Sequence, residues 1–103
     1  MNLSDYQQVR LVLSDYRAHG AKSYRKKQFQ RACSILDEIL AYEGLNEISK
    51  LGRRQIIGYW RRHEHESQKT RIEKFRILKI LFLRLGKNEP PKPKLICQKQ
   101  KKN

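Results

Sequence analysis

Residues 67–86, SQKTRIEKFRILKILFLRLG, have the pattern of one complete α-helix with both of its ends marked. Ser67 is a residue type that caps helix starts, and Gly86 is the type that most often ends helices. Between them, apolar residues recur at steps of three and four: Ile72, Phe75, Leu78, Phe82 and Leu85. This spacing predicts one apolar face, and the second half of the segment is apolar on most sides. We therefore expect this helix to lie at the centre of a helical bundle.

Three more helices are predicted before this one, over about Ser4 to His19, Ser23 to Tyr42 and Arg53 to His65. Each shows apolar residues at helical spacing, and a glycine follows each of the first two. Gly52, with Gln55 three residues later, is a plausible cap for the third. No run alternates apolar and polar residues over the length of a strand. The sequence therefore predicts an all-α fold, a small four-helix bundle.

The chain of 103 residues and 12.4 kDa is large enough for one domain with a single core. We expect the four-helix domain to occupy residues 1–86. Residues 87–103 hold six lysines, all three prolines and one acidic residue, and this composition predicts a flexible basic C-terminal tail or an interdomain linker. Cys33 and Cys97 have no pairing motif, so both are expected to be free thiols.

The chain is strongly basic, with 24 Lys and Arg residues against 10 Asp and Glu residues and a formal net charge of +14. Such an excess favours a polyanionic partner, with nucleic acid ahead of an anionic membrane surface. The longest apolar cluster, residues 77–85, is interrupted by Lys79 and Arg84 and falls short of the ~20 residues of a membrane span. No signal-peptide pattern is present at the N-terminus. We therefore expect a cytoplasmic protein.

The cations gather in the first turns of three predicted helices, where the helix dipole favours acidic residues. They are Lys22, Arg25, Lys26, Lys27 and Arg31 in the second helix, Arg53 and Arg54 in the third, and Lys69 and Arg71 in the fourth. Helix starts also present free N–H groups to phosphate oxygens, so we infer that these starts are built for a negatively charged partner. Two other interpretations stay open. Abundant cations fall at helix starts by chance, or polar neighbours such as Ser67 serve only as caps.

Nothing in the sequence indicates catalysis. His63 and His65 are two residues apart, so on a helix their side chains diverge and cannot share a metal ion. We expect both to be solvated surface. The motifs HExxH, GxxxxGK[ST], GxGxxG and GxSxG do not occur. The sequence therefore predicts a protein that is not an enzyme and that uses no cofactor or metal.

Three segments, taken together, resemble a known family. KSYRKKQFQRACSIL (residues 22–36) is a basic Ser-Tyr helix start followed by an apolar stripe. ISKLGRRQIIGYW (48–60) is an Ile-x-x-Leu turn into a helix that ends in Tyr-Trp, and SQKTRIEKFRILKILFLRLGK (67–87) opens with Ser-x-x-Thr. Their order resembles the N-terminal core-binding domain of tyrosine recombinases, the phage-type integrases, over about residues 3–93.

The resemblance implies a SAM-like four-helix bundle that clamps duplex DNA from the face opposite a catalytic domain, in DNA integration and recombination. It implies DNA contacts from the starts of the second and fourth helices: Lys22, Ser23, Arg25, Lys26, Lys27, Ser67, Lys69, Thr70, Arg71 and Lys74. Arg53 and Arg54 join this set only through their position at a basic helix start. The implied setting is a bacterial or phage-encoded protein of the nucleoid, with a catalytic recombinase domain as partner. The family's catalytic His-x-x-Arg motif is absent from this sequence, so strand cleavage is not implied.

Three alternatives remain open. The helices predicted over residues 53–65 and 67–85 could form the helix-turn-helix of a DNA-binding regulator, which dimerisation would favour. The apolar flank of the last helix could instead dock on a partner protein, with the charge serving solubility. RNA is a further ligand, although few aromatic residues are available to stack on its bases.

Overall fold

The computed structural model of the protein describes the backbone of residues 1–14 and 22–93, and the side chains of residues 1–13 and 26–93. Within these ranges all regular secondary structure is helical: α1 (Leu3–Ser14), α2 (Lys22–Glu43), α3 (Arg53–Arg62) and α4 (Gln68–Arg84), with the short 3-10 helix η1 (Ile48–Lys50) before α3. This confirms the predicted all-α fold of four helices. The last residues predicted for the first helix, 15–19, lie outside the described part of the chain.

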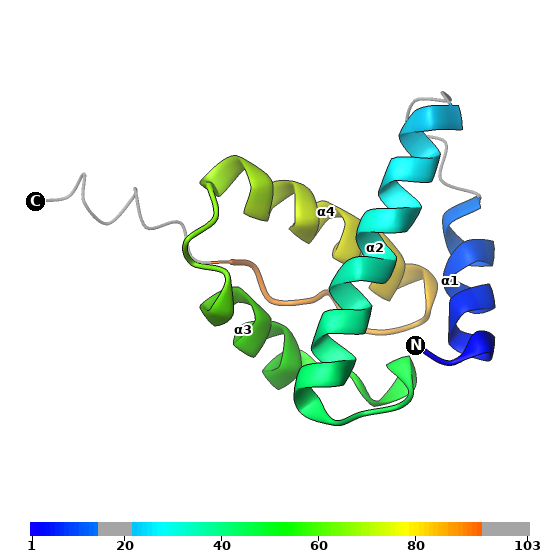
Figure 1. The fold of residues 1–103 in the computed structure, drawn as a ribbon, viewed down its shortest axis with the longest axis horizontal. Helices are drawn as coiled ribbons and strands as arrows, with labels where there is room; N and C mark the ends of the chain where they lie inside the picture. The colour runs from blue at the N-terminus through cyan, green and yellow to red at the C-terminus, as the bar shows by residue number, and fades with distance from the viewer. Residues whose placement is uncertain (15–21, 94–103) are drawn as a thin grey trace, which may run out of the picture.

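The helices pack around α2, which spans the middle of the molecule (Figure 1). α1 lies beside the first half of α2, α3 lies near its C-terminal end, and α4 crosses it. α2 contacts each of the other three helices, and α1 also contacts α4. The long second helix therefore organises the bundle, and the others bury their apolar faces against it.

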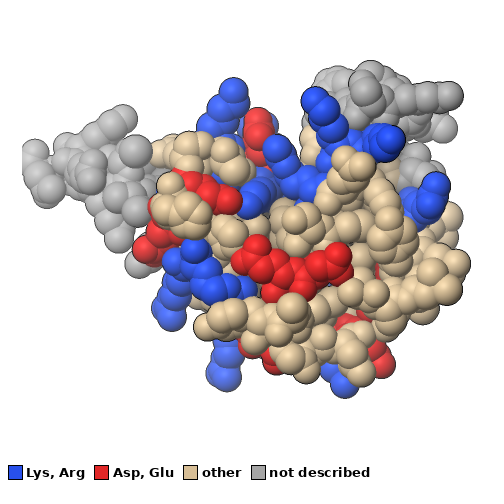
Figure 2. All heavy atoms as spheres, in the orientation of Figure 1, with Lys and Arg blue, Asp and Glu red and all other residues tan. Residues whose placement is uncertain are grey.

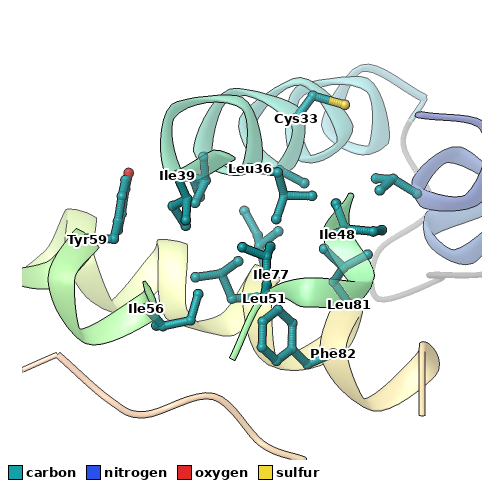
Figure 3. Close-up of a cluster of buried hydrophobic side chains, with 14 of the residues drawn as sticks. Cys33, Leu36, Ile39, Ile48, Leu51, Ile56, Tyr59, Ile77, Leu81 and Phe82 are labelled. Carbon is teal, nitrogen blue, oxygen red and sulfur yellow. The ribbon is translucent and has the colours of Figure 1, made fainter. Parts of the chain in front are cut away.

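The core lies where these helices meet (Figure 3). Leu78 and Leu81 of α4 are fully buried, and they belong to one cluster with Leu36 and Ile39 of α2 and Ile56 of α3. The predicted central role of α4 is confirmed, because most of the apolar residues in its second half are buried. No helix in the described part of the chain is long and apolar enough to cross a membrane.

Cys33 is a buried thiol of this core and forms no disulfide, as the sequence predicts. Burial, with a smaller effect of the Asp37 carboxylate, raises the pKa of the thiol to about 11. The thiol is therefore protonated at neutral pH and acts as a small apolar side chain. Cys97 lies outside the described residues.

Most helix ends fall where local residue types predict them. The Ser67 hydroxyl accepts a hydrogen bond from the Thr70 N–H at 3.1 Å, which caps α4. The N–H of Gly52, which precedes α3, donates to the Gln55 side-chain oxygen at 2.8 Å. Gly44 and Gly86 follow α2 and α4 with φ of 70° and 80°, in the left-handed region where glycine carries no steric penalty.

The end of α3 differs from the expectation. The helix stops at Arg62, and residues 63–66 form a turn in which the Glu66 N–H donates to the His63 carbonyl at 3.1 Å. The predicted helix ran to His65, and the expected divergence of His63 and His65 assumed helical geometry for both. That expectation is wrong, because neither residue lies within a helix.

The segment that follows α4 also differs from the expectation of a free tail. Residues 87–93 are not helical, yet Pro90 and Pro93 are buried and the Trp60 indole N–H donates to the Pro91 carbonyl at 2.8 Å. Lys87 Nζ donates to the carbonyls of Ser49 and Leu51, at 3.1 and 3.0 Å. These residues therefore pack on the helical body. Residues 94–103 of the predicted tail lie outside the described part of the chain.

Candidate nucleic-acid interface

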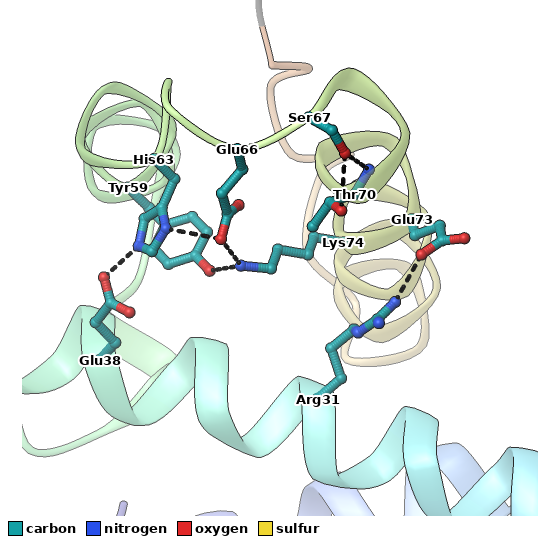
Figure 4. A network of polar contacts seen from close by, with 9 residues as sticks. All are labelled: Arg31, Glu38, Tyr59, His63, Glu66, Ser67, Thr70, Glu73 and Lys74. Atoms are coloured by element: carbon teal, nitrogen blue, oxygen red, sulfur yellow. Dashed lines mark hydrogen bonds and ion pairs between the residues drawn. The ribbon is translucent and has the colours of Figure 1, made fainter.

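At the start of α4 the two predicted hydroxyl contacts are used by the helix cap. Ser67 accepts from the Thr70 N–H and also donates its own hydroxyl proton to Thr70 Oγ1 at 3.0 Å (Figure 4). The capping role that the sequence analysis left open for Ser67 is thus confirmed. Lys69 is exposed beside the cap and remains available to a phosphate.

Arg71 was expected to contact DNA, but the structure places its side chain inside the fold, with an exposed fraction of only 4%. The physical reason is helical phase: Arg71 precedes Phe75 by four residues and Leu78 by seven, so all three lie on the inward face of α4. The side chain lines a groove of about 570 Å³ between α3 and residues 89–92. Arg71 is therefore part of the folded body and does not lie on the outer surface of α4.

Lys74, the last predicted contact of α4, is also turned inward. Its ammonium group donates to the Glu66 carboxylate at 2.7 Å and to the Tyr59 hydroxyl at 2.9 Å (Figure 4). Only 13% of the Lys74 side chain is exposed. The structure therefore gives no support to a phosphate contact at Lys74, because its charge is already neutralised by an internal carboxylate.

The pKa values of Tyr59, Glu66 and Lys74 reflect both the burial of these side chains and their contacts with one another. Burial raises the pKa of the Tyr59 hydroxyl, and the hydrogen bond from Lys74 opposes this only in part. Burial acts to raise the pKa of Glu66, but hydrogen bonds from Lys74 and contact with His63 outweigh it, and the pKa lies below its ordinary value. Burial acts to lower the pKa of Lys74, but hydrogen bonds to Glu66 and Tyr59 outweigh it, and the pKa is raised. The fold therefore stabilises a charged Lys74 beside a charged Glu66 and a neutral Tyr59.

His63 is likewise not the solvated surface residue that was expected. Its ring lies 4.1 Å from the Tyr59 ring, and its Nε2 contacts the Glu38 carboxylate of α2 at 2.5 Å. Only 14% of its side chain is exposed. His65, by contrast, is exposed as predicted.

The first turns of the helices do not gather into one surface. Figure 1 shows the start of α2 at one corner of the molecule, and the starts of α3 and α4 at two others. At the start of α2, Lys26 and Lys27 are exposed as expected. The side chains of Lys22, Ser23 and Arg25 lie outside those that the structure describes.

A basic surface does form further along α2 and α4. Arg31 of α2 and Glu73 of α4 make an ion pair with an Nη1 to Oε1 distance of 3.1 Å, which brings the outer sides of the two helices together. Lys27 precedes Arg31 by one helical turn, and Lys69 and Arg76 lie one turn to either side of Glu73. The α2–α4 basic surface comprises the exposed or half-exposed cations of these outer sides: Lys27, Arg31, Lys69, Arg76 and Lys79.

Figure 2 shows Lys and Arg side chains gathered in two places, with acidic side chains between them. One group lies along the upper edge, over α4 and the first half of α2, and the other lies over α3 at the lower left. The sequence prediction missed Arg76 and Lys79, which do not lie at a helix start. Arg76 lies nearly opposite Leu78 on a helical projection, and this signal could have found it. Lys79 follows the buried Phe75 by four residues, so helical phase does not predict its exposure.

The second group is the α3 arginine surface, made of the exposed side chains of Arg53, Arg54 and Arg61. Both predicted residues of this helix, Arg53 and Arg54, are therefore placed at the surface. Acidic residues also flank this helix, because Glu43 lies in the groove on one side and Glu64 and Glu89 lie in the groove on the other. The α3 arginine surface is thus the less uniformly positive of the two.

Comparisons with known protein families, with curated proteins and with solved structures find no match to this chain. The resemblance to an integrase domain therefore rests on the three segments quoted above. The α2–α4 basic surface is the feature of this chain that bears most directly on its function.

Proposed function

We propose that the protein is a non-catalytic DNA-binding domain that holds duplex DNA against its α2–α4 basic surface. The observation that supports this most directly is the pairing of Arg31 with Glu73. The one acidic side chain on this part of α4's outer side is neutralised within the surface, which leaves Lys27, Lys69, Arg76 and Lys79 to a partner. Among the described residues these four cations form no ion pair with another side chain.

The shape of this surface favours contact with phosphates over the reading of bases. Lys69 and Lys79 lie about 15 Å apart along α4, at a rise of 1.5 Å per residue, so they can reach different phosphates of one strand. The inner side of α4 is committed to the core, which keeps the helix from entering deeply into a major groove. We infer binding with modest sequence preference, in which Lys and Arg position the duplex.

The integrase resemblance supplies the biological setting of this proposal. A bundle of this kind would hold one face of the DNA during integration or recombination, in the cytoplasm and on the nucleoid, while a separate catalytic domain cuts the strands. The buried Arg71 and the internally paired Lys74 argue for a clamp that uses the outer sides of α2 and α4 in place of the first turn of α4.

The alternatives have less support from the described residues. A helix-turn-helix would read bases with the first residues of α4, but there Ser67 and Thr70 form a cap and Arg71 is buried. A protein-docking site on the second half of α4 would need exposed apolar residues. Most of them are in the core, and Leu83 is the large apolar residue of α4 that remains exposed, at 52%.

Fluorescence anisotropy across a salt series tests the proposal, with duplex DNA, a matched RNA duplex and an acidic peptide as ligands. If five to eight phosphates are neutralised, the logarithm of the association constant should fall against the logarithm of the salt concentration with a slope of roughly −5 to −7. A slope shallower than about −2, or equal affinity for the acidic peptide, would contradict duplex binding by this surface.

A further inference from the structure

The turn between α3 and α4 brings three metal-ligating residue types together. Because α3 ends at Arg62, His63, His65 and Glu66 follow one another around a tight turn. One ring nitrogen from each histidine and one carboxylate oxygen of Glu66 all lie within 4.8 Å of one another. The two histidine rings lie close together, with centroids 5.6 Å apart and planes inclined by 30°.

His63 is held in an orientation that suits a ligand. Its Nε2 contacts Glu38 Oε2 at 2.5 Å, and a carboxylate in this position accepts the Nε2 proton (Figure 4). In the neutral ring this leaves the lone pair on Nδ1, which faces Glu66. Nδ1 is buried, and within the described part of the chain it has no hydrogen-bond partner, although Glu66 Oε2 lies 3.2 Å away without the alignment of a hydrogen bond.

The Glu66 carboxylate is also held in an orientation that suits a metal ligand. Its Oε2 accepts from Lys74 Nζ at 2.7 Å, which fixes the carboxylate against α4. Its Oε1 is buried and has no hydrogen-bond partner among the described residues. A buried acceptor without a protein partner is commonly satisfied by an ordered water or an ion. His63 and Glu66 therefore each have one buried ligand atom without a partner among the described residues, and Glu38 from α2 and Lys74 from α4 fix the two side chains.

We propose that His63, His65 and Glu66 form a zinc site. Imidazole nitrogen and carboxylate oxygen are ligands that Zn²⁺ accepts, and three protein ligands with a water in the fourth position give its tetrahedral geometry. Ligand atoms around a tetrahedral zinc ion lie roughly 3.3 Å apart, because the Zn–N and Zn–O bonds are about 2.0–2.2 Å long. The 3.2 Å between His63 Nδ1 and Glu66 Oε2, the carboxylate oxygen that also accepts from Lys74, already matches this spacing.

Little rearrangement is needed to complete the site. His65 is exposed, so its ring can rotate to bring a nitrogen from the 4.8 Å range to the spacing of the other pair. Glu38 then serves as the carboxylate that orients His63 from behind, and Lys74 orients Glu66, as outer partners of metal ligands commonly do. Zinc in this position would fix the turn that joins α3 to α4 and tie it to α2.

Isothermal titration of the metal-free protein with ZnCl₂ tests this inference. His65→Ala removes one ligand but leaves the contacts of His63 with Glu38 and of Glu66 with Lys74 in place. Glu64→Gln is the matched control, because Glu64 is exposed, adjacent in sequence and outside the proposed ligand set. We expect equimolar Zn²⁺ binding that weakens at least ~10-fold in His65→Ala and stays unchanged in Glu64→Gln, with a Co²⁺ complex showing the visible absorption of a tetrahedral site.

Specific results of the same experiments would overturn the zinc site. Absence of Zn²⁺ binding at micromolar concentration would overturn the zinc site. Equal binding by His65→Ala and the parent protein would also overturn it, as would a loss caused by His19→Ala, which removes the remaining histidine of the chain. Circular dichroism of each variant confirms that it is folded, and the DNA affinity is measured separately, so the two proposals can fail independently.

Discussion

Arg71 and Lys74 are separated by less than one turn of α4, and for both of them burial decides what the charge can do. The sequence places Arg71 at a basic helix start, and the family resemblance adds Lys74 as a DNA contact. Both side chains are turned inward, because Phe75 and Leu78 share their side of the helix. Helical phase could have predicted their burial. The partners of Lys74 could not be predicted, because Glu66 and Tyr59 come from the preceding turn and from α3.

The Tyr59, Glu66 and Lys74 trio predicts a bell-shaped dependence of stability on pH. The pKa of Glu66 is depressed in the fold, so its stabilisation is full above its ordinary pKa of 4.5 and is lost as the pH falls through the folded value. The pKa values of Lys74 and Tyr59 are raised above 10.5 and 10.0, so their stabilisation is lost as the pH rises beyond those values. Urea unfolding from pH 3 to pH 11 should show a plateau between these limits.

The matched variant for this measurement is Glu66→Gln. It removes the carboxylate whose pKa is depressed, so the loss of unfolding free energy on the acid side should become shallower than in the parent protein. If the free energy of unfolding of Glu66→Gln falls as steeply at acid pH as that of the parent protein, Glu66 does not contribute to the pH dependence.

At the scale of the elements, local signals predicted most helix starts and stops, although not the end of α3 at Arg62, and tertiary contacts decided the rest. Ser67, Gly44 and Gly86 act through their own backbone neighbours, so the sequence suffices to place them. The packing of residues 87–93 depends on Trp60, a residue of α3 that meets Pro91 only after folding. A composition rich in lysine and proline does not predict that contact, so the sequence analysis assigned all of residues 87–103 to a tail or linker.

Two glycines test this distinction in opposite directions. Gly58 lies within α3, where a Cβ would meet only the end of the Arg62 side chain, at 3.3 Å, and the Glu43 carboxylate, at 3.7 Å. Gly58→Ala should raise the free energy of unfolding by about 0.5 kcal/mol, because alanine loses less backbone entropy in a helix. Gly86→Ala should lower it by about 1 kcal/mol, because φ at Gly86 is positive.

Chemical denaturation of both variants beside the parent protein measures these effects. Destabilisation by Gly58→Ala would mean that the Arg62 guanidinium, which stacks on the Tyr42 ring at 3.6 Å, cannot give way. An unchanged free energy of unfolding in Gly86→Ala would mean that the end of α4 can adopt another conformation without a residue in the left-handed region.

On the scale of the whole molecule, the sequence gives the net charge of +14 but not its distribution. The predicted grouping of helix starts does not form, because the starts of α2, α3 and α4 lie at separate corners (Figure 1). What the fold creates instead is a basic surface along the outer sides of α2 and α4, where Arg31 and Glu73 meet across 42 residues of sequence. Such a contact carries no local sequence signal, so the joining of α2 and α4 into one basic surface could be seen only in the structure.

The most direct test of DNA binding by the α2–α4 basic surface compares two double charge reversals. Lys27→Glu with Arg76→Glu alters this surface, and Arg54→Glu with Arg61→Glu alters the α3 arginine surface. All four residues are exposed, and both pairs lower the net charge by the same amount. Duplex DNA affinity is measured for both variants over the same salt series.

We expect the Lys27→Glu, Arg76→Glu protein to bind duplex DNA at least ~30-fold more weakly than the parent, with a salt slope shallower by about 2, because two phosphate contacts are lost. The Arg54→Glu, Arg61→Glu protein should keep the salt slope of the parent. Equal losses in the two variants would mean that only the net charge attracts DNA, and a larger loss in the α3 variant would place the interface on α3.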